Sequence, residues 1–230
     1  MKTIGLIGGM SWESTVPYYR LINTAIKERL GGLHSARIVL YSVDFDEIEK
    51  LQVAGAWDAA GAQLASVART LQGAGADFLV LCTNTMHKVA PAIQAAVGIP
   101  LLHIAEPTAA AIKAAGYSTV GLLGTRFTIE QPFYRERLRE RGLCVLTPSA
   151  ADTEATHRII YDELCLGLVR EESRAVYRRA MADLAQRGAE AIILGCTEIS
   201  LLVGREDSPV PLFDTTAIHA RAAAEAALAA

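Results

Sequence analysis

Two loops of this chain carry thiol, hydroxyl and carboxyl groups that could exchange protons with a substrate. Residues 196–198 (Cys-Thr-Glu) follow the apolar run AIILG, and residues 82–87 (Cys-Thr-Asn-Thr-Met-His) follow the apolar run FLVL. A cysteine at a strand end, next to the amides that begin a helix, can have a lowered pKa and act as a nucleophile or a base. Cys196 is therefore a candidate catalytic group, and Glu198 is close enough to orient or deprotonate it. The alternatives are a buried core cysteine and an ordinary carboxylate at a helix start.

The two loops belong to an internal repeat, which pairs their residues. GADFLVLCTNT from Gly75 aligns without a gap on GAEAIILGCTE from Gly188, at an offset of 188 − 75 = 113. This offset places Thr83 opposite Cys196. Side chains alternate along a strand, so a Thr83 that faces the site puts Cys82 on the packed side, unless the turn breaks the alternation. Thr83 is thus the predicted partner of Cys196, with Cys82 as a second, assisting possibility.

Other residues of these loops are suited to binding a small acid. Asn84 and Thr85 offer donors for a carboxylate, although both are also common N-caps. Gly8 and Gly9 lack the spacing of a dinucleotide loop, and with Met10 they would let the backbone approach a small ligand closely. Cysteine and histidine are too sparse here for zinc, so no metal is predicted.

The elements that must position these loops alternate between short apolar runs and longer segments of helical period. This pattern is typical of βα units around a parallel sheet with both faces covered. The expected strands span 3–7, 37–42, 78–81, 100–103, 119–123, 143–146, 191–194 and 211–213. The expected helices span 14–29, 46–51, 56–73, 88–96, 105–115, 129–141, 153–164, 171–187 and 215–229.

The repeat extends over most of the chain and predicts two pseudo-symmetric α/β domains. TIGLIGG from Thr3 matches TVGLLGT from Thr119 (119 − 3 = 116), and GIPLLHI from Gly98 matches PVPLFDT from Pro209 (209 − 98 = 111). We expect a first domain at 1–115, joined by a C-terminal helix at 214–230, and a second at 116–213. Ligands of such sheets bind at the carboxyl ends of the strands, so the site is expected in the cleft between the domains.

Composition excludes several classes of partner. With 51% hydrophobic and 20% charged residues and a net charge of −3, the chain has the composition of a globular protein without a basic stripe for nucleic acid. No run of 18 apolar residues suggests a membrane span. The four cysteines lack CxxC spacing, which is typical of reduced thiols in the cytoplasm.

Three motifs resemble those of the aspartate/glutamate racemase superfamily, and most closely its bacterial broad-specificity amino-acid racemases. They are GLIGGMSWEST at 5–15, CTNTMH at 82–87 and GCTEI at 195–199. The resemblance implies two similar α/β domains and a cytoplasmic homodimer that needs neither pyridoxal phosphate nor metal. It also implies two cysteines, one on each face of the substrate Cα, that remove and deliver a proton.

Carried onto this chain, the second family cysteine falls on Cys196 and the first on Thr83. The remaining implied contacts are to the substrate carboxylate and ammonium (Asn84, Thr85, Thr197) and to the pocket walls (Met10, Gln52, Thr125). A hydroxyl can relay or donate a proton but is a poor base. This leaves two alternatives, a strong preference for one enantiomer or a Cys82 side chain that swings into the site. Gln52 and the neutral residues 164–166 stand where aspartate-specific relatives place basic side chains, which leaves room for glutamate, homoserine or other polar substrates.

Two other readings stay open at this point. The same scaffold supports hydantoin racemases, maleate isomerases and arylmalonate decarboxylases. The threonine at position 83 also fits an amino-acid-binding protein whose catalytic pair has decayed.

Overall fold

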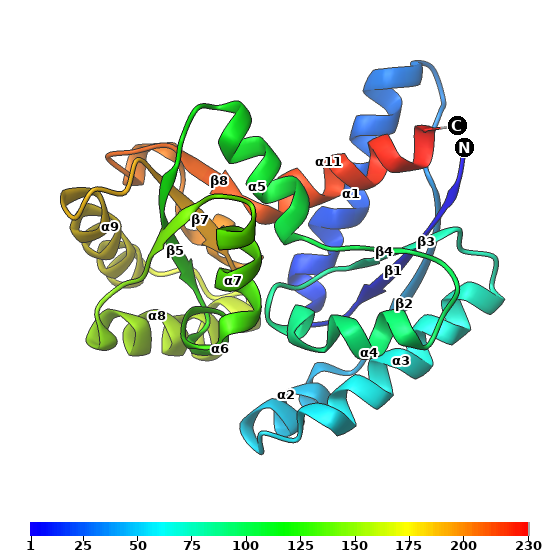
Figure 1. Ribbon diagram of the computed structural model, residues 1–230, viewed down its shortest axis with the longest axis horizontal. Helices are drawn as coiled ribbons and strands as arrows, with labels where there is room; N and C mark the ends of the chain where they lie inside the picture. Colours follow the sequence, from blue (N-terminus) through cyan, green and yellow to red (C-terminus); the bar gives the residue numbers. More distant parts are fainter. Residues whose placement is uncertain (230) are drawn as a thin grey trace. The chain divides into compact units, whose positions relative to one another are not determined.

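The computed structural model of the protein describes residues 1–229 and contains two compact units. One unit comprises Met1–Ile104 and the C-terminal segment from His219, and the other comprises Ala105–Ile218. Each unit holds a four-stranded sheet, parallel throughout, with helices on both faces (Figure 1). The predicted α/β class with two similar, mainly parallel sheets is confirmed.

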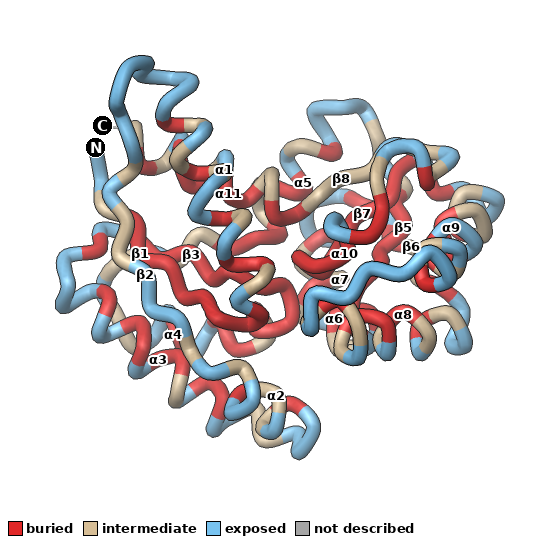
Figure 2. Tube along the Cα trace, turned by 180° about the vertical axis from the view of Figure 1, so that it is seen from behind, coloured by how far each residue is buried: buried red, intermediate tan, exposed pale blue. Residues whose placement is uncertain are grey.

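The sheet of the first unit has the strand order β2-β1-β3-β4. Its strands are β1 (Thr3–Gly8), β2 (Arg37–Ser42), β3 (Phe78–Leu81) and β4 (Leu101–Leu102). The central strands β1 and β3 are almost entirely buried, whereas the edge strand β2 is largely accessible (Figure 2). This burial explains the continuous apolar runs IGLI and FLVL, because strands covered on both faces need no polar side.

Helices cover the two faces of this sheet with separate apolar clusters. The helices of this unit are α1 (Trp12–Leu30), α2 (Phe45–Val53), α3 (Trp57–Gly73), the 3-10 helix η1 (Thr85–Val89), α4 (Ala90–Ala95) and most of α11 (Thr215–Leu228). Helices α1 and α11 pack on the face that receives Leu6 and Val80. Helices α2, α3 and α4 pack on the face that receives Leu79 and Leu81.

The sheet of the second unit repeats this topology, with the order β6-β5-β7-β8. Its strands are β5 (Thr119–Gly124), β6 (Cys144–Leu146), β7 (Ala191–Gly195) and β8 (Leu212–Asp214). Ile7 pairs with Leu81 in the first sheet, and Leu123 pairs with Leu194 in the second. The offsets are 123 − 7 = 116 and 194 − 81 = 113, the values found in the sequence repeat. The repeat is therefore a repeat of strand pairing as well as of sequence.

The helices of the second unit differ from the prediction in two places. They are α5 (Ala105–Ala114), α6 (Arg126–Glu130), α7 (Pro132–Glu140), α8 (Ala150–Asp162), η2 (Leu164–Leu166), α9 (Glu171–Gln186), α10 (Ile199–Leu202), η3 (Arg205–Asp207) and the start of α11. The single helix predicted at 129–141 is two helices, because Gln131 precedes a proline and adopts an extended conformation (φ −82°, ψ 145°). The short helices α10 and η3 were not predicted.

Helix α5 belongs to the second unit, whereas the predicted boundary at 115 placed it in the first. Glu106, in the first turn of α5, forms ion pairs with Arg137 (3.6 Å) and Arg141 (2.5 Å) at the end of α7. Ile112 of α5 is fully buried. These contacts tie α5 to α7, so the chain leaves the first unit at Ile104, directly after β4.

Among the described residues, the helices are all too short or too polar to cross a membrane.

A buried histidine of the first unit has both ring nitrogens bonded. Nε2 of His219 lies 2.9 Å from the carbonyl oxygen of Leu102, and Nδ1 lies 2.9 Å from the hydroxyl of Tyr18. A carbonyl only accepts, so Nε2 carries the proton and Nδ1 accepts the hydroxyl hydrogen. Burial lowers the pKa of His219 to about 4, and the ring is neutral near pH 7.

The unfolding free energy should therefore fall as the pH decreases from about 6.5 to about 4. In this window the unfolded chain binds a proton at His219 that the folded chain excludes, so acid favours unfolding. The shift corresponds to a loss on the order of 3 kcal/mol. Urea unfolding at several pH values checks this. The loss should shrink in His219→Gln and persist in His34→Gln, since His34 is exposed.

Candidate active site

The first unit holds six of the ten predicted site residues, and five of them lie together near the carboxyl ends of β1 and β3. Met10 follows β1, and Thr83, Asn84 and Thr85 follow β3. Gln52 comes from α2 and donates a hydrogen bond to the sulfur of Met86 at 3.0 Å, in the helical turn that follows Thr85. All five predicted residues are buried. This unit therefore brings the polar groups of the first loop and the side chain of Gln52 to one edge of its sheet.

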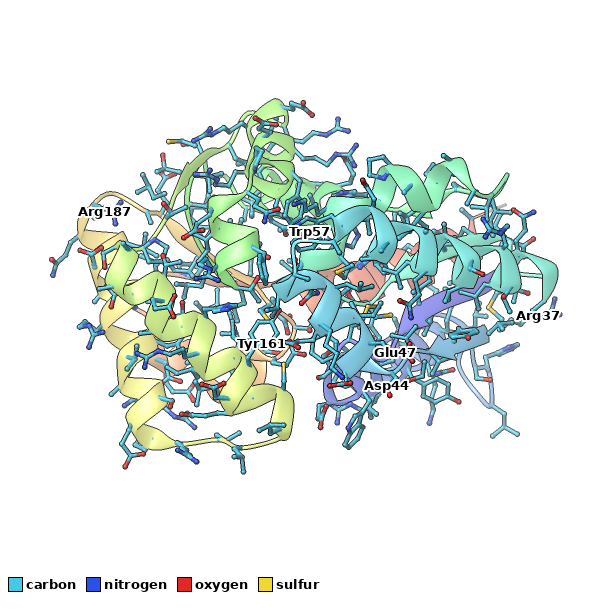
Figure 3. The ribbon with its side chains drawn as sticks, turned by 90° about the horizontal axis from the view of Figure 1, so that it is seen from below. Arg37, Asp44, Glu47, Trp57, Tyr161 and Arg187 are labelled. Carbon is cyan, nitrogen blue, oxygen red and sulfur yellow. The ribbon has the colours of Figure 1, made fainter. Side chains whose placement is uncertain are left out.

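Helix α2, which carries Gln52, is fixed at its start and along its length. Asp44 caps the helix by accepting a hydrogen bond from the Asp46 amide at 3.2 Å. Glu47, which is labelled together with Asp44 in Figure 3, accepts a hydrogen bond from Gln63 of α3 at 2.9 Å. Ile48 of the same helix is buried in the cluster that contains Met10 and Met86. The position of Gln52 therefore depends on packing as well as on its own hydrogen bond.

The side chain of Cys82 lies in the hydrophobic core. It is fully buried in the cluster formed by β1, β3, α1 and α11, and burial raises the pKa of its thiol. Thr83 is the next residue, and its amide donates to the carbonyl of Leu81 at 2.9 Å in a tight turn at the end of β3. Cys82 therefore occupies the packed side that strand alternation predicts for it.

Packing within the unit accounts for the glycines after β1. Gly9 has φ 88°, a left-handed conformation that favours glycine, and a Cβ there would collide with the backbone of Val43. A Cβ on Gly8 would meet the side chain of Thr15 at 2.5 Å. The Gly9 amide donates to Thr15 Oγ1 at 2.9 Å. The two glycines therefore let β1 and the residue after it approach the loop after β2 and helix α1 closely.

The second unit places the other predicted residues at the carboxyl ends of β5 and β7. Thr125 follows β5 and caps α6, where its hydroxyl oxygen accepts from the Thr128 amide at 3.3 Å. Cys196 follows β7. The two strand ends are close, because a Cβ on Gly124 would lie 2.9 Å from the carbonyl oxygen of Gly195. This unit therefore brings Thr125 and Cys196 to neighbouring strand ends.

The carboxylate of Glu198 accepts two hydrogen bonds within this loop. The thiol of Cys196 donates to Oε2 at 2.9 Å, and the hydroxyl of Thr197 donates to the same oxygen at 2.8 Å. All three residues are buried. Glu198 thus orients the thiol and is in position to accept its proton, as the sequence suggested.

Burial raises the pKa of the Cys196 thiol well above its ordinary value, and the charge of Glu198 raises it further. The lowered pKa predicted from the start of a helix is wrong for this structure. The helix that follows, α10, has only four residues, so it offers little favourable dipole against the cost of burying a thiolate. The thiol therefore holds its proton, and a nearby positive charge would favour its release.

No group of three or more His, Cys, Asp or Glu side chains that could hold a metal ion occurs within residues 1–229.

The pattern of the Asp/Glu/Hydantoin racemase family matches residues 7–223. The chain belongs to this family. The match includes both units and every predicted site residue, and it confirms the resemblance inferred from the three motifs.

Three individual proteins are similar to this racemase-family chain over nearly its whole length. It is 24% identical to the broad-specificity amino-acid racemase RacX of Bacillus subtilis, over 98% of each chain. A Yersinia pestis protein assigned to the Asp/Glu racemases is 60% identical, with a TM-score of 0.92 over the whole of both chains. An aspartate racemase homologue from Pyrococcus horikoshii is 33% identical, with a TM-score of 0.84 over 99% of each chain. These likenesses support a racemase of the isomerase class.

Proposed function

We propose that this member of the racemase family interconverts the enantiomers of an amino acid without a cofactor, by proton transfer at Cα. The observation that carries the proposal is the Cys196 thiol, bonded to Glu198 at 2.9 Å at the end of β7, with Thr83 at the equivalent position after β3. Thr83 and Cys196 each lie two residues beyond a paired leucine, Leu81 and Leu194. The pair therefore supplies one proton-transfer group from each unit.

The reaction starts when a substrate with a positive ammonium group lowers the cost of a thiolate. Glu198 takes the proton from Cys196, and the thiolate then takes the Cα proton, which leaves its electron pair on Cα. Thr83 delivers a proton to the opposite face and regains one from solvent, and Glu198 returns the thiol proton to solvent, so that every group ends in its starting state. In the reverse direction Thr83, after its hydroxyl has given a proton to solvent, is the base, and the protonated Cys196 is the acid, a role that suits its raised pKa.

The other buried polar groups of the two strand-end loops hold the substrate in this proposal. Asn84, Thr85 and Thr197 bind the carboxylate and ammonium groups, and Met10, Gln52 and Thr125 form the walls. The neutral amide of Gln52 favours a polar, uncharged or flexible side chain over aspartate alone, because a carboxylate side chain is bound best by a basic residue. Homoserine is accordingly among the substrates that we expect, and glutamate and aspartate are candidates on the family match alone.

Solvent-deuterium exchange at Cα tests the proposal. The common amino acids are incubated with the protein in D₂O, with D and L forms separate, and the loss of the Hα signal is followed by NMR. We expect exchange, followed by inversion, for at least one amino acid without added cofactor or metal. Absence of exchange for every amino acid tested would refute racemase activity toward these compounds.

One specific observation favours a second function, an amino-acid-binding protein that has lost catalysis. The hydroxyl of Thr83 stands where the family places a thiol, and a hydroxyl is the weaker acid and base. Such a protein would gain thermal stability from a particular amino acid and yet show no Cα exchange with it. A related hydantoin racemase or maleate isomerase would instead act on those acids and leave amino acids unchanged.

We also propose a cytoplasmic homodimer. Trp12, Val16 and Tyr19 form an exposed apolar stripe on α1, with 64%, 56% and 55% of their surfaces accessible. Aromatic residues of this kind are enriched at subunit interfaces. Sedimentation equilibrium should give a dimer for the natural chain and a monomer for the double variant Val16→Glu, Tyr19→Glu. A natural chain that sediments as a monomer would contradict the proposal.

A further inference from the structure

His87 is buried at the end of the Thr83 loop, and both of its ring nitrogens are bonded to backbone groups. Nδ1 lies 2.7 Å from the carbonyl oxygen of Thr83, and the amide of Ile104 donates to Nε2 at 3.1 Å. The carbonyl can only accept and the amide can only donate, so these partners select one tautomer. His87 is a neutral imidazole with its proton on Nδ1, and that proton holds the backbone of Thr83.

Ile104, whose amide donates to Nε2 of His87, is the last residue of the first unit before the chain passes into α5. The ring of His87 also contacts that of His103 edge-on, with centroids 4.4 Å apart. Two residues before Ile104, the carbonyl of Leu102 accepts the hydrogen bond from His219, the first residue of the returning chain. The Thr83 turn is thus attached through His87 to a backbone segment that is itself fixed on a second side.

The equivalent loop of the second unit has no such histidine. The repeat offset of 113 places Ser200 at the position of His87 (87 + 113 = 200). The hydroxyl of Ser200 donates to the carbonyl of Thr197 at 3.2 Å, whereas the carbonyl of Cys196 accepts from the Ile199 amide. The side chain of His87 thus donates to the backbone carbonyl of Thr83, whereas a backbone amide donates to that of Cys196. The two loops therefore hold their proton-transfer residues differently.

We propose that His87 is a positioning residue for Thr83, fixing its backbone so that the hydroxyl can deliver a proton to Cα. This inference rests on the proposed function. Proton transfer depends steeply on geometry, and a misplacement of about 1 Å can cost about a hundredfold in rate. A hydroxyl is intrinsically the weaker of the two groups, so its step tolerates misplacement least. His87 itself donates its proton to a backbone carbonyl and takes no part in the chemistry.

Two conservative variants separate the two bonds of His87. His87→Asn keeps a donor near the position of Nδ1, and His87→Gln keeps an acceptor near that of Nε2. The readout is the ratio of inversion to Cα exchange with retention, because Cys196 can exchange the proton on its own face without Thr83. We expect the ratio to fall at least tenfold in His87→Gln and to recover to within about threefold of the natural chain in His87→Asn.

Tyr18→Phe is the matched control, because it removes one hydrogen bond from the same buried region without altering the Thr83 turn. Its inversion ratio should stay unchanged even if its stability falls. An unchanged ratio in His87→Gln would overturn the inference, whereas absence of all exchange in the natural chain would overturn the proposed function. In the natural chain, two-dimensional ¹⁵N NMR of the imidazoles should show His87 protonated on Nδ1, and an Nε2 proton would also overturn the inference.

Discussion

Replacing Cys196 by alanine should abolish exchange of the Cα proton with solvent for both enantiomers of a substrate. We expect a decrease of at least about a thousandfold, at the upper part of the range for loss of a general acid or base. The remaining group, Thr83, has a hydroxyl whose pKa lies far above that of a thiol, so it cannot abstract the proton by itself at a useful rate. Loss of the Hα signal in D₂O, followed by NMR, measures both enantiomers directly.

The matched control for this variant is Cys144→Ala. Cys144 is also a free thiol of the second unit, but it is exposed at the start of β6. Its removal should leave exchange within about twofold, since surface changes away from a site have small effects. Exchange retained in Cys196→Ala at a rate near that of the natural chain would contradict the proposed role of this thiol. The exchange rate of Glu198→Gln should lie between those of Cys196→Ala and Cys144→Ala, because the amide can still accept a hydrogen bond but is a far weaker base.

Replacing Thr83 by cysteine should raise the rate of inversion by roughly tenfold or more. The change supplies a group with a much lower pKa at the position that limits the reaction, and general acid-base catalysis improves as the pKa approaches the working pH. The largest gain is expected in Cα exchange of the enantiomer whose proton faces Thr83. Chiral chromatography gives the inversion rate, and NMR in D₂O gives the exchange rate of each enantiomer.

Thermodynamics determines which kinetic quantities can reveal the difference in acidity between the Thr83 hydroxyl and the Cys196 thiol. Free enantiomers have equal free energies, so kcat/KM must be the same in both directions for any racemase, and a simple preference for one enantiomer cannot appear there. The asymmetry expected from the sequence should instead appear in kcat and KM taken separately, and in exchange that occurs without inversion. Thr83→Val, which has nearly the same shape but no hydroxyl, should retain exchange on the Cys196 face and lose inversion. Equal inversion in Thr83→Val and the natural chain would exclude the hydroxyl as the second group.

Sequence reasoning performed best where one local pattern decides the structure. The eight predicted strands all occur, because each is a short apolar run between turn residues, and the strand pairing follows the repeat offsets. The break between α6 and α7 was missed although its cause, Pro132, is visible in the sequence. The position of α5 could not be predicted in the same way, since it depends on ion pairs between Glu106 and α7 that join distant parts of the chain.

In the site, residue identities were easier to predict than their electrostatics. The positions of Cys196 and Glu198 follow from their spacing, but the direction of the thiol pKa depends on how deeply the sulfur is buried and on where the carboxylate points. The role of His87 also escaped the sequence, where a single histidine in a helix is most simply a surface or packing residue. One of its two bonds is to a backbone amide seventeen residues away, at Ile104, and local periodicity carries no information about that contact.

The second unit is one continuous stretch of chain, whereas the first is made of two separate stretches. The two units can therefore complete their folding at different times during synthesis. Residues 105–218 are contiguous, so the second unit can complete its core as soon as it leaves the ribosome. The first unit is discontinuous: alanines of α11 at positions 220, 223, 224 and 227 share one cluster with Leu6, and the amide of Lys2 donates to the carbonyl of Ala227. Strand β1 thus acquires the last of its packing partners only after the whole of the second unit has been synthesised. We therefore expect the loop that begins with Thr83 to complete its packing after the loop that carries Cys196, and a premature stop before α11 to remove one of the two helices that cover Cys82.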